Sequence, residues 1–161
     1  MAVDPKGIRM ATGGLDYHVR LWDFHGMNKN MNSFRIIEPF AGNAIRSISF
    51  NPAGTHLMVV NGGKQITFLD KDGARSLLTV KGYMYVKELH NTKGHTNTIY
   101  DGKFHPINSN EFASASGDGS IRLWDMNQKL EGIEQELAHK VLLKCKDSKG
   151  LATGITSLCY T

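Results

Sequence analysis

Three residues in the second half of the chain have the side chains that a hydrolytic enzyme uses as nucleophile, base and orienting acid. Ser114, His95 and Asp118 could take these roles, because a serine hydroxyl becomes a nucleophile when a carboxylate-held imidazole removes its proton. The pattern Gly-x-Ser-x-Gly, which presents such a serine on a sharp turn, does not occur in the chain. Hydrolysis at Ser114 therefore remains an alternative, to be compared with a structural role for the same residues.

Two other groups of residues could bind a ligand. Residues 61–64, Asn-Gly-Gly-Lys, resemble part of a phosphate loop, but they lack the full Gly-x-x-x-x-Gly-Lys-Ser/Thr pattern and precede no helical pattern. His90, His95 and His105 could ligate a metal, but no cysteine or carboxylate stands at ligand spacing from them. We therefore expect a hairpin turn at 61–64, and no catalytic residue, metal, cofactor or small-molecule substrate.

The residues around Ser114 occur twice in the chain. Residues 113–125 read Ala-Ser-Ala-Ser-Gly-Asp-Gly-Ser-Ile-Arg-Leu-Trp-Asp, and residues 11–23 read Ala-Thr-Gly-Gly-Leu-Asp-Tyr-His-Val-Arg-Leu-Trp-Asp. Each copy predicts two short strands joined by a tight turn whose glycines allow positive φ angles. The matching positions pair Thr12 with Ser114, Asp16 with Asp118, and Trp22 with Trp124.

A weaker third copy lies between the two. Residues 55–70 follow the same pattern, and Leu69-Asp70 stands where the other copies have Trp-Asp. Leu69 is 47 positions after Trp22 and 55 positions before Trp124. Propeller repeats of the Trp-Asp type recur every 40–45 residues or so, with four strands in each blade. The spacing therefore indicates repeated blades with modest insertions.

These motifs resemble WD repeats, which implies a buried chain of hydrogen bonds in the complete copies. Gly94-His95 begins the best copy and Trp124-Asp125 ends it. The resemblance assigns Trp124, Ser114, His95 and Asp118 to this structural tetrad, and the hydrogen-bonding capacities of their side chains fit that order. In the first copy the matching residues are Thr12, Asp16 and Trp22. The middle copy has Asn43, Val59, Gly63 and Leu69 at the four places, so we expect hydrophobic packing alone to hold it.

A narrower resemblance is carried by residues 16–28, which include Trp-Asp-Phe-His-Gly-Met, and by Asn-Thr-Lys-Gly-His-Thr at 91–96. Both segments resemble the gastrulation-defective family, also called the WD repeat-containing protein 70 family. That resemblance implies a nuclear protein, with the cytoplasm as an additional location. It also implies large assemblies that act in the DNA damage response or chromatin regulation, with pre-mRNA splicing as the alternative.

The composition is that of an ordinary globular chain. Of 161 residues, 40% are hydrophobic and 21% are charged, and no apolar run approaches the ~20 residues that span a bilayer. The residues before the first apolar stretch include Asp4, Pro5 and Lys6, so we expect no signal peptide. Cys145 and Cys159 lack metal or disulfide spacing, and we expect both to be buried, reduced thiols.

We predict an all-β fold, an incomplete WD-type β-propeller of about three blades plus one strand. Residues 1–41 form a blade that lacks its first strand, 42–93 a degenerate blade with an insertion at 82–93, and 94–146 a third blade. We expect a polar loop with a helical turn at 126–137. Residues 147–161 are expected to form a connector and, at 155–160, the first strand of a further blade.

Function in such a fold is expected to reside on the surface that carries the tight turns. Arg46 and Tyr100 stand four residues before Phe50 and Phe104, at places that the motif predicts to be exposed. Arginine and tyrosine are enriched among the residues that dominate protein interfaces. We therefore select Arg46 and Tyr100 as protein-binding candidates, together with Thr98, Leu15 and Thr156, although each could be an ordinary solvated residue.

The sequence thus favours a non-catalytic scaffold that binds other proteins of a nuclear complex. A second hypothesis is nucleic-acid binding, since the net charge is +4 and the isoelectric point is about 9.1. Lysines and arginines are scattered singly among acidic residues, so direct nucleic-acid contact is the weaker expectation, and no membrane association is expected. The third hypothesis is the hydrolase that uses Ser114.

Overall fold

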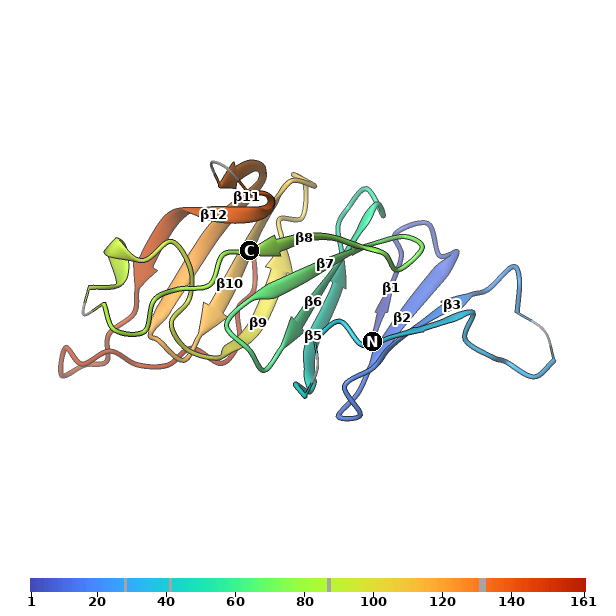
Figure 1. The fold of residues 1–161 in the computed structure, drawn as a ribbon, viewed down its shortest axis with the longest axis horizontal. Coiled ribbons are helices and arrows are strands. Elements are labelled where there is room, and N and C mark those ends of the chain that lie inside the picture. The colour runs from blue at the N-terminus through green and yellow to red at the C-terminus, as the bar shows by residue number, and fades with distance from the viewer. Residues whose placement is uncertain (28, 41, 87, 131–132) are drawn as a thin grey trace.

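The computed structural model describes residues 1–161 except 28, 41, 87, 131 and 132, and the regular secondary structure of the described residues is almost entirely antiparallel strands (Figure 1). The first sheet has the order β1-β2-β3-β4. Its strands are β1 (Ala2–Val3), β2 (Arg9–Gly13), β3 (Val19–Asp23) and β4 (Arg35–Ile37). The expectation that this blade lacks its first strand is wrong, because residues 2–3 form a short first strand that pairs with Met10 and Ala11 of β2.

The rest of the chain forms one sheet of eight strands in the order β5-β6-β7-β8-β12-β11-β10-β9. It contains two meanders of four strands, each of which corresponds to one predicted blade (Figure 1). The strands are β5 (Ile45–Phe50), β6 (His56–Asn61), β7 (Ile66–Asp70), β8 (Arg75–Thr79), β9 (Ile99–Phe104), β10 (Glu111–Ser116), β11 (Ser120–Leu130) and β12 (Ile133–Lys144).

Alternation along β6 explains how the middle blade packs against both of its neighbours without a Trp-Ser-His-Asp tetrad. Leu57 and Val59 point to one side of β6 and join the core with Ala11, Val19 and Leu21 of the first sheet. The next residues along the strand, Met58 and Val60, point to the other side. Because both faces of β6 are covered, the strand reads as a nearly continuous apolar run, and its side chains from Leu57 to Asn61 are buried.

A second core lies between the middle and third blades and is rich in aromatic rings. Phe68 of β7 contacts Phe112 with ring centres 4.9 Å apart, and Phe112 stacks on Trp124 at 5.8 Å with an interplanar angle of 3°. Phe104 of β9 completes the cluster by edge contacts with both phenylalanines. This stack seats Trp124, one of the predicted tetrad residues, between two blades.

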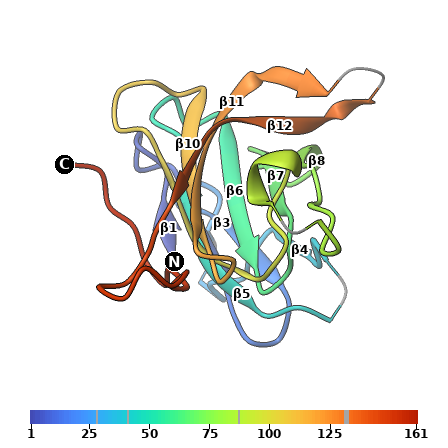
Figure 2. The ribbon, with the colours of Figure 1, turned by 90° about the vertical axis from the view of Figure 1, so that its left-hand side faces the viewer.

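An unpredicted pairing joins the outer edges of the middle and third blades. Leu137 of β12 lies in parallel register with Thr79 of β8, and the Val80 N–H donates to the Leu137 carbonyl at 2.9 Å. The strands β11 and β12 continue as a long hairpin to reach this edge (Figure 2). The prediction of a polar loop with a helical turn at 126–137 is therefore wrong for the described residues, because pairing between β11 and β12 keeps both segments extended. Residues 131 and 132 lie outside the described part.

The same backbone hydrogen bond recurs where one blade meets the next. The N–H of Ile45 donates to Gly14 O at 3.1 Å, that of Ile99 to Gly63 O at 2.9 Å, and that of Ile155 to Ser116 O at 3.1 Å. Ile155 thus occupies the place that begins β5 and β9. Residues 155–160 are nevertheless not a strand, contrary to expectation, because among the described residues no neighbouring strand pairs with them.

The insertion at 82–93 forms a surface arm whose described residues contain one short 3₁₀ turn, η1 (Leu89–Asn91). Its two ends are fixed close to each other, since the Gly82 N–H donates to His95 O at 3.0 Å. Gly82 and Gly94 allow this close approach, because a Cβ on Gly94 would lie against the Val80 carbonyl oxygen and 2.8 Å from Gly82 N. Residue 87 of the arm and the boundary residue 41 lie outside the described residues.

Candidate functional site

The structure brings the four predicted tetrad residues of the third blade into one hydrogen-bonded chain. The Trp124 indole N–H donates to Ser114 Oγ at 2.8 Å, and Ser114 Oγ lies 2.7 Å from His95 Nε2. On its other side, His95 Nδ1 lies 3.0 Å from Asp118 Oδ2. Strand β10 supplies Ser114, β11 supplies Trp124, the turn between them supplies Asp118, and the segment before β9 supplies His95.

The hydrogen-bonding capacities of these groups determine which group donates and which accepts in each hydrogen bond of the tetrad. An ionised carboxylate only accepts, so His95 Nδ1 carries the proton and donates to Asp118. The bare Nε2 then accepts from the Ser114 hydroxyl, and Ser114 Oγ in turn accepts from the Trp124 N–H. Each polar group thereby has a partner, and such a network is favourable only when it is complete.

Burial and hydrogen bonding shift the pKa values of the acid and the imidazole in this chain. Burial lowers the pKa of His95 below its ordinary value of 6.5, against the opposing effect of Asp118. Burial acts to raise the pKa of Asp118, but hydrogen bonds from His95, Ser120 and the Thr96 N–H outweigh it and hold that pKa well below 3.8. The network therefore consists of a neutral imidazole beside a carboxylate at neutral pH.

The same geometry resembles a hydrolytic triad, but the surroundings of Ser114 differ from those of a nucleophile. The Ser114 and His95 side chains are fully buried. In addition, Ser114 Oγ already accepts a hydrogen bond from the Trp124 indole N–H. The arrangement is suited to hold β10, β11 and the residues before β9 together.

The first blade has a shorter version of this network. The Trp22 N–H donates to Thr12 Oγ1 at 3.0 Å, which matches the contact between Trp124 and Ser114. Asp16, however, forms an ion pair with Arg20 at 2.6 Å on the surface, and this hydrogen bond lowers the pKa of Asp16. The structure thus joins Thr12 with Trp22 but does not join Asp16 to them.

The middle blade has none of the four tetrad residues. Val59 and Leu69 stand where the other blades have Ser or Thr and Trp, and both are buried in the apolar core. Gly63 takes the place of the aspartate, and its N–H donates to Asn61 Oδ1 at 3.2 Å. Asn43 takes the place of the histidine and is partly buried.

Two polar features of the third blade were not predicted from the sequence. Ser120 Oγ donates to Asp118 Oδ1 at 2.6 Å and so extends the tetrad; its position directly after the Gly-Asp-Gly turn was the available signal. Arg122 is fully buried and donates from Nη1 to Thr92 O at 2.9 Å and from Nη2 to Leu89 O at 3.1 Å. Periodicity placed Arg122 on a strand but could not reveal that the arm at 82–93 folds over it.

The selected surface residues lie along the line where the blades meet. Arg46 is exposed, but Tyr100 is partly buried, contrary to expectation, because the Arg46 guanidinium lies over its ring with 5.6 Å between the guanidinium carbon and the ring centre. Leu15 is 82% exposed and follows Gly14, whose carbonyl bonds to the start of β5. Thr98 is partly buried and Thr156 is exposed, next to Ile155. We call these five residues the turn face: Leu15, Arg46, Thr98, Tyr100 and Thr156.

The free cysteines differ from expectation. Cys159 is exposed and Cys145 is half-buried, because residues 155–160 lie at the surface instead of inside a sheet. Among the described residues no group of three or more His, Cys, Asp or Glu side chains could hold a metal ion. Within the same part of the chain, no helix has the length and apolar character needed to cross a membrane.

The repeated four-stranded blades and the buried Trp-Ser-His-Asp network define a WD-repeat β-propeller fold. The family model described as "WD domain, G-beta repeat" matches residues 1–23 and 86–125. A solved structure titled "Structure of U3-55K" shares the fold with a TM-score of 0.67 over 89% of this chain and 38% of its own, at 13% sequence identity.

Within this class the chain resembles the WD repeat-containing protein 70 or gastrulation-defective family over its full length. It is 37% identical over 100% of its residues to WD repeat-containing protein 70 of Xenopus tropicalis, and 36% identical over 100% to that of Homo sapiens. It is 34% identical over 98% to the gastrulation defective protein 1 homolog of Drosophila melanogaster. The chain spans 25%, 24% and 23% of these proteins, respectively.

Proposed function

We propose that this chain is a non-catalytic scaffold whose turn face binds another protein of a nuclear complex. The observation that carries the proposal is the contact between Arg46 and Tyr100 across the boundary of two blades. The aromatic ring holds the long arginine side chain in place, which reduces the conformational entropy that binding would otherwise cost. Arginine and tyrosine are also the residue types on which interface energies concentrate.

The absence of catalysis is part of the proposal and rests on Ser114. A nucleophile must contact its substrate, whereas Ser114 is fully buried and already accepts a hydrogen bond from Trp124. The tetrad therefore serves stability, and function is assigned to the exposed turn face.

A nuclear location, and a role in the DNA damage response or chromatin regulation, is proposed on the resemblance to WD repeat-containing protein 70. Pre-mRNA splicing is the alternative process within the same proposal. Expression of a fluorescently tagged chain in cells tests the location, and exclusion of the chain from the nucleus would contradict it.

Protein capture from nuclear extract tests the proposed scaffold directly. Extract treated with nuclease is passed over the immobilised chain and over an R46E/Y100A variant, and retained proteins are compared by quantitative mass spectrometry. The matched control is R35E/Y17A, which changes the same residue types at two exposed positions outside the turn face. We expect a defined set of proteins to be retained by the wild type and the control and lost from R46E/Y100A. Retention that vanishes with nuclease, or survives in R46E/Y100A, contradicts the proposal.

A further inference from the structure

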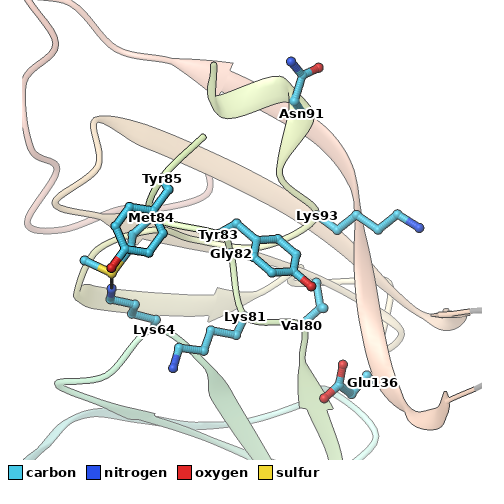
Figure 3. Close-up of a pocket in the computed structure, with 10 residues that line it drawn as sticks. All are labelled: Lys64, Val80, Lys81, Gly82, Tyr83, Met84, Tyr85, Asn91, Lys93 and Glu136. Carbon is cyan, nitrogen blue, oxygen red and sulfur yellow. Dashed lines mark hydrogen bonds between the residues drawn. The ribbon is translucent and has the colours of Figure 1, made fainter. Parts of the chain in front are cut away.

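A pocket of about 670 Å³ opens between the arm at 82–93 and the edge where β8 meets β12 (Figure 3). Lys64 of the turn between β6 and β7 lines it, as do Lys81, Tyr83 and Tyr85 at the start of the arm. The volume lies within the range of about 300–1,000 Å³ that ligand sites occupy in proteins. The pocket adjoins the turn face but shares none of its residues.

Positive charge gathers around this pocket. Lys64, Lys81 and Lys93 line it, against one carboxylate, Glu136. In Figure 3 Lys64 and Lys81 lie on one side of the Tyr83 ring, and Lys93 and Glu136 on the other. Three lysines against one carboxylate give this concave surface a net positive charge, which makes it a local site for an anion.

The walls between the lysines are exposed and apolar. Tyr83 is 74% exposed and Tyr85 is 93% exposed, and Met84 between them is 62% exposed. Aromatic rings left open to solvent beside a hollow are suited to cover an apolar side chain of a partner. The pocket thus offers cationic groups for an acid and rings for a neighbouring apolar group.

The arm that forms one wall of the pocket is anchored to strands β11 and β12 of the third blade. Arg122 donates to Leu89 O and Thr92 O, and His139 Nδ1 lies 2.8 Å from Lys93 O. The other end of the arm is held by the hydrogen bond from Gly82 N to His95 O. Because both ends are fixed to the third blade, a ligand would not have to order the whole insertion when it binds.

We propose that this pocket binds a short acidic peptide segment of a partner protein, in which Asp or Glu carboxylates contact Lys64 and Lys81 and an apolar side chain covers Tyr83. The inference rests on the proposed scaffold function and gives the chemistry of a segment bound beside the turn face. Glu136 favours a peptide over a nucleic acid, since its carboxylate can accept from a peptide N–H but would repel a continuous phosphate backbone.

Fluorescence anisotropy with a defined probe tests the inference. The probe is a fluorescein-labelled ten-residue peptide of aspartate and glutamate around one phenylalanine, titrated with the 161-residue chain at low ionic strength. We expect binding that weakens about ten-fold or more in K64E/K81E, because two attractive charges become repulsive. K29E/K149E makes the same change in net charge on exposed lysines outside the pocket lining, and binding should stay within about two-fold of the wild type.

Three outcomes would overturn the inference. The first is a lack of peptide binding, and the second is an equal loss of peptide affinity in K64E/K81E and K29E/K149E. The third is that a fifteen-residue oligothymidine binds more tightly than the peptide and that K64E/K81E abolishes this binding, which would assign the pocket to nucleic acid. The test also separates this inference from the scaffold proposal. If K64E/K81E still retains the proteins that R46E/Y100A loses, and the peptide does not bind, only the pocket inference fails.

Discussion

The guanidinium group of Arg46 lies over the ring of Tyr100, with 5.6 Å between the guanidinium carbon and the ring centre, and this contact links β5 to β9 across two blades. Tyr100 is itself held from below, since a Cβ on Gly117 would lie 3.1 Å from its Cε2 atom. The tight turn after β10 thus supports the ring that positions the arginine.

The pair of Arg46 and Tyr100 should contribute little to folding. An exposed contact between a cation and a ring is worth about 0.5–1 kcal/mol. We expect a double-mutant cycle of Arg46→Ala and Tyr100→Ala, measured by urea unfolding, to give a coupling free energy of that size. Tyr100→Phe, which keeps the ring, should retain the coupling. A coupling of several kcal/mol would mean that the pair is structural and would weaken its assignment as a binding surface.

Acidification should destabilise the third blade from near neutral pH downwards. The folded pKa of His95 is below 6.5, so the unfolded chain binds more protons and the free energy of unfolding falls as the pH drops below that value. Burial shifts the pKa values of His56 and His139 in the same direction. Asp118, whose pKa is lowered from 3.8, adds a second loss as the pH falls below about 4.

Urea unfolding between pH 8 and pH 4 measures this dependence. The wild type should lose stability as the pH falls through 6.5, and His95→Gln should lose less over the same interval because one titrating group is absent. A free energy of unfolding that rises on acidification would contradict the assignment of a neutral, buried His95.

Gly94→Ala should disturb the base of the arm. Its new Cβ would meet the Val80 carbonyl and lie 2.8 Å from Gly82 N, both of which are backbone groups and cannot rotate away. Overfilling of this kind costs about 1–3 kcal/mol. Gly26→Ala is the control, since its nearest neighbour would be 3.8 Å away. Equal stabilities of the two variants by thermal unfolding would show that the arm adjusts freely.

Arg122→Leu should release the arm while keeping most of the buried volume. The carbonyls of Leu89 and Thr92 would lose their donors, at a cost of about 1–3 kcal/mol in the free energy of unfolding. Limited proteolysis should then cut between residues 83 and 91 faster than in the wild type. Lys140→Leu removes an exposed ion pair with Glu111 and should change neither quantity measurably. Unchanged cleavage in Arg122→Leu would contradict the anchoring role.

The sequence predicted the structure correctly where the repeat motif itself determines the local fold. The two short strands and the tight Gly-Asp-Gly turn of residues 113–125 predicted the hairpin that joins Ser114 to Trp124. The exposed position of Arg46 also followed from its place in the motif.

The sequence could not predict features that depend on pairing between distant segments. The parallel register of Leu137 with Thr79 requires the outer strands of two blades, β12 and β8, to meet, and no local signal encodes that meeting. The burial of Arg122 could not be predicted because its acceptors belong to an arm about thirty positions earlier. Residues 155–160 had a strand pattern, but pairing also requires a neighbouring strand.

The substitution Ser114→Ala tests the central claim, that the Trp-Ser-His-Asp network holds the blade together and performs no chemistry. Urea unfolding should show a loss of about 1–3 kcal/mol, because the Trp124 N–H and His95 Nε2 both lose their buried partner. Thr12→Ala, which removes one partly buried contact with Trp22, should cost less. The rate of nitrophenyl ester hydrolysis should equal that of the wild type. A variant that keeps its stability and loses a measurable hydrolytic rate would contradict the account.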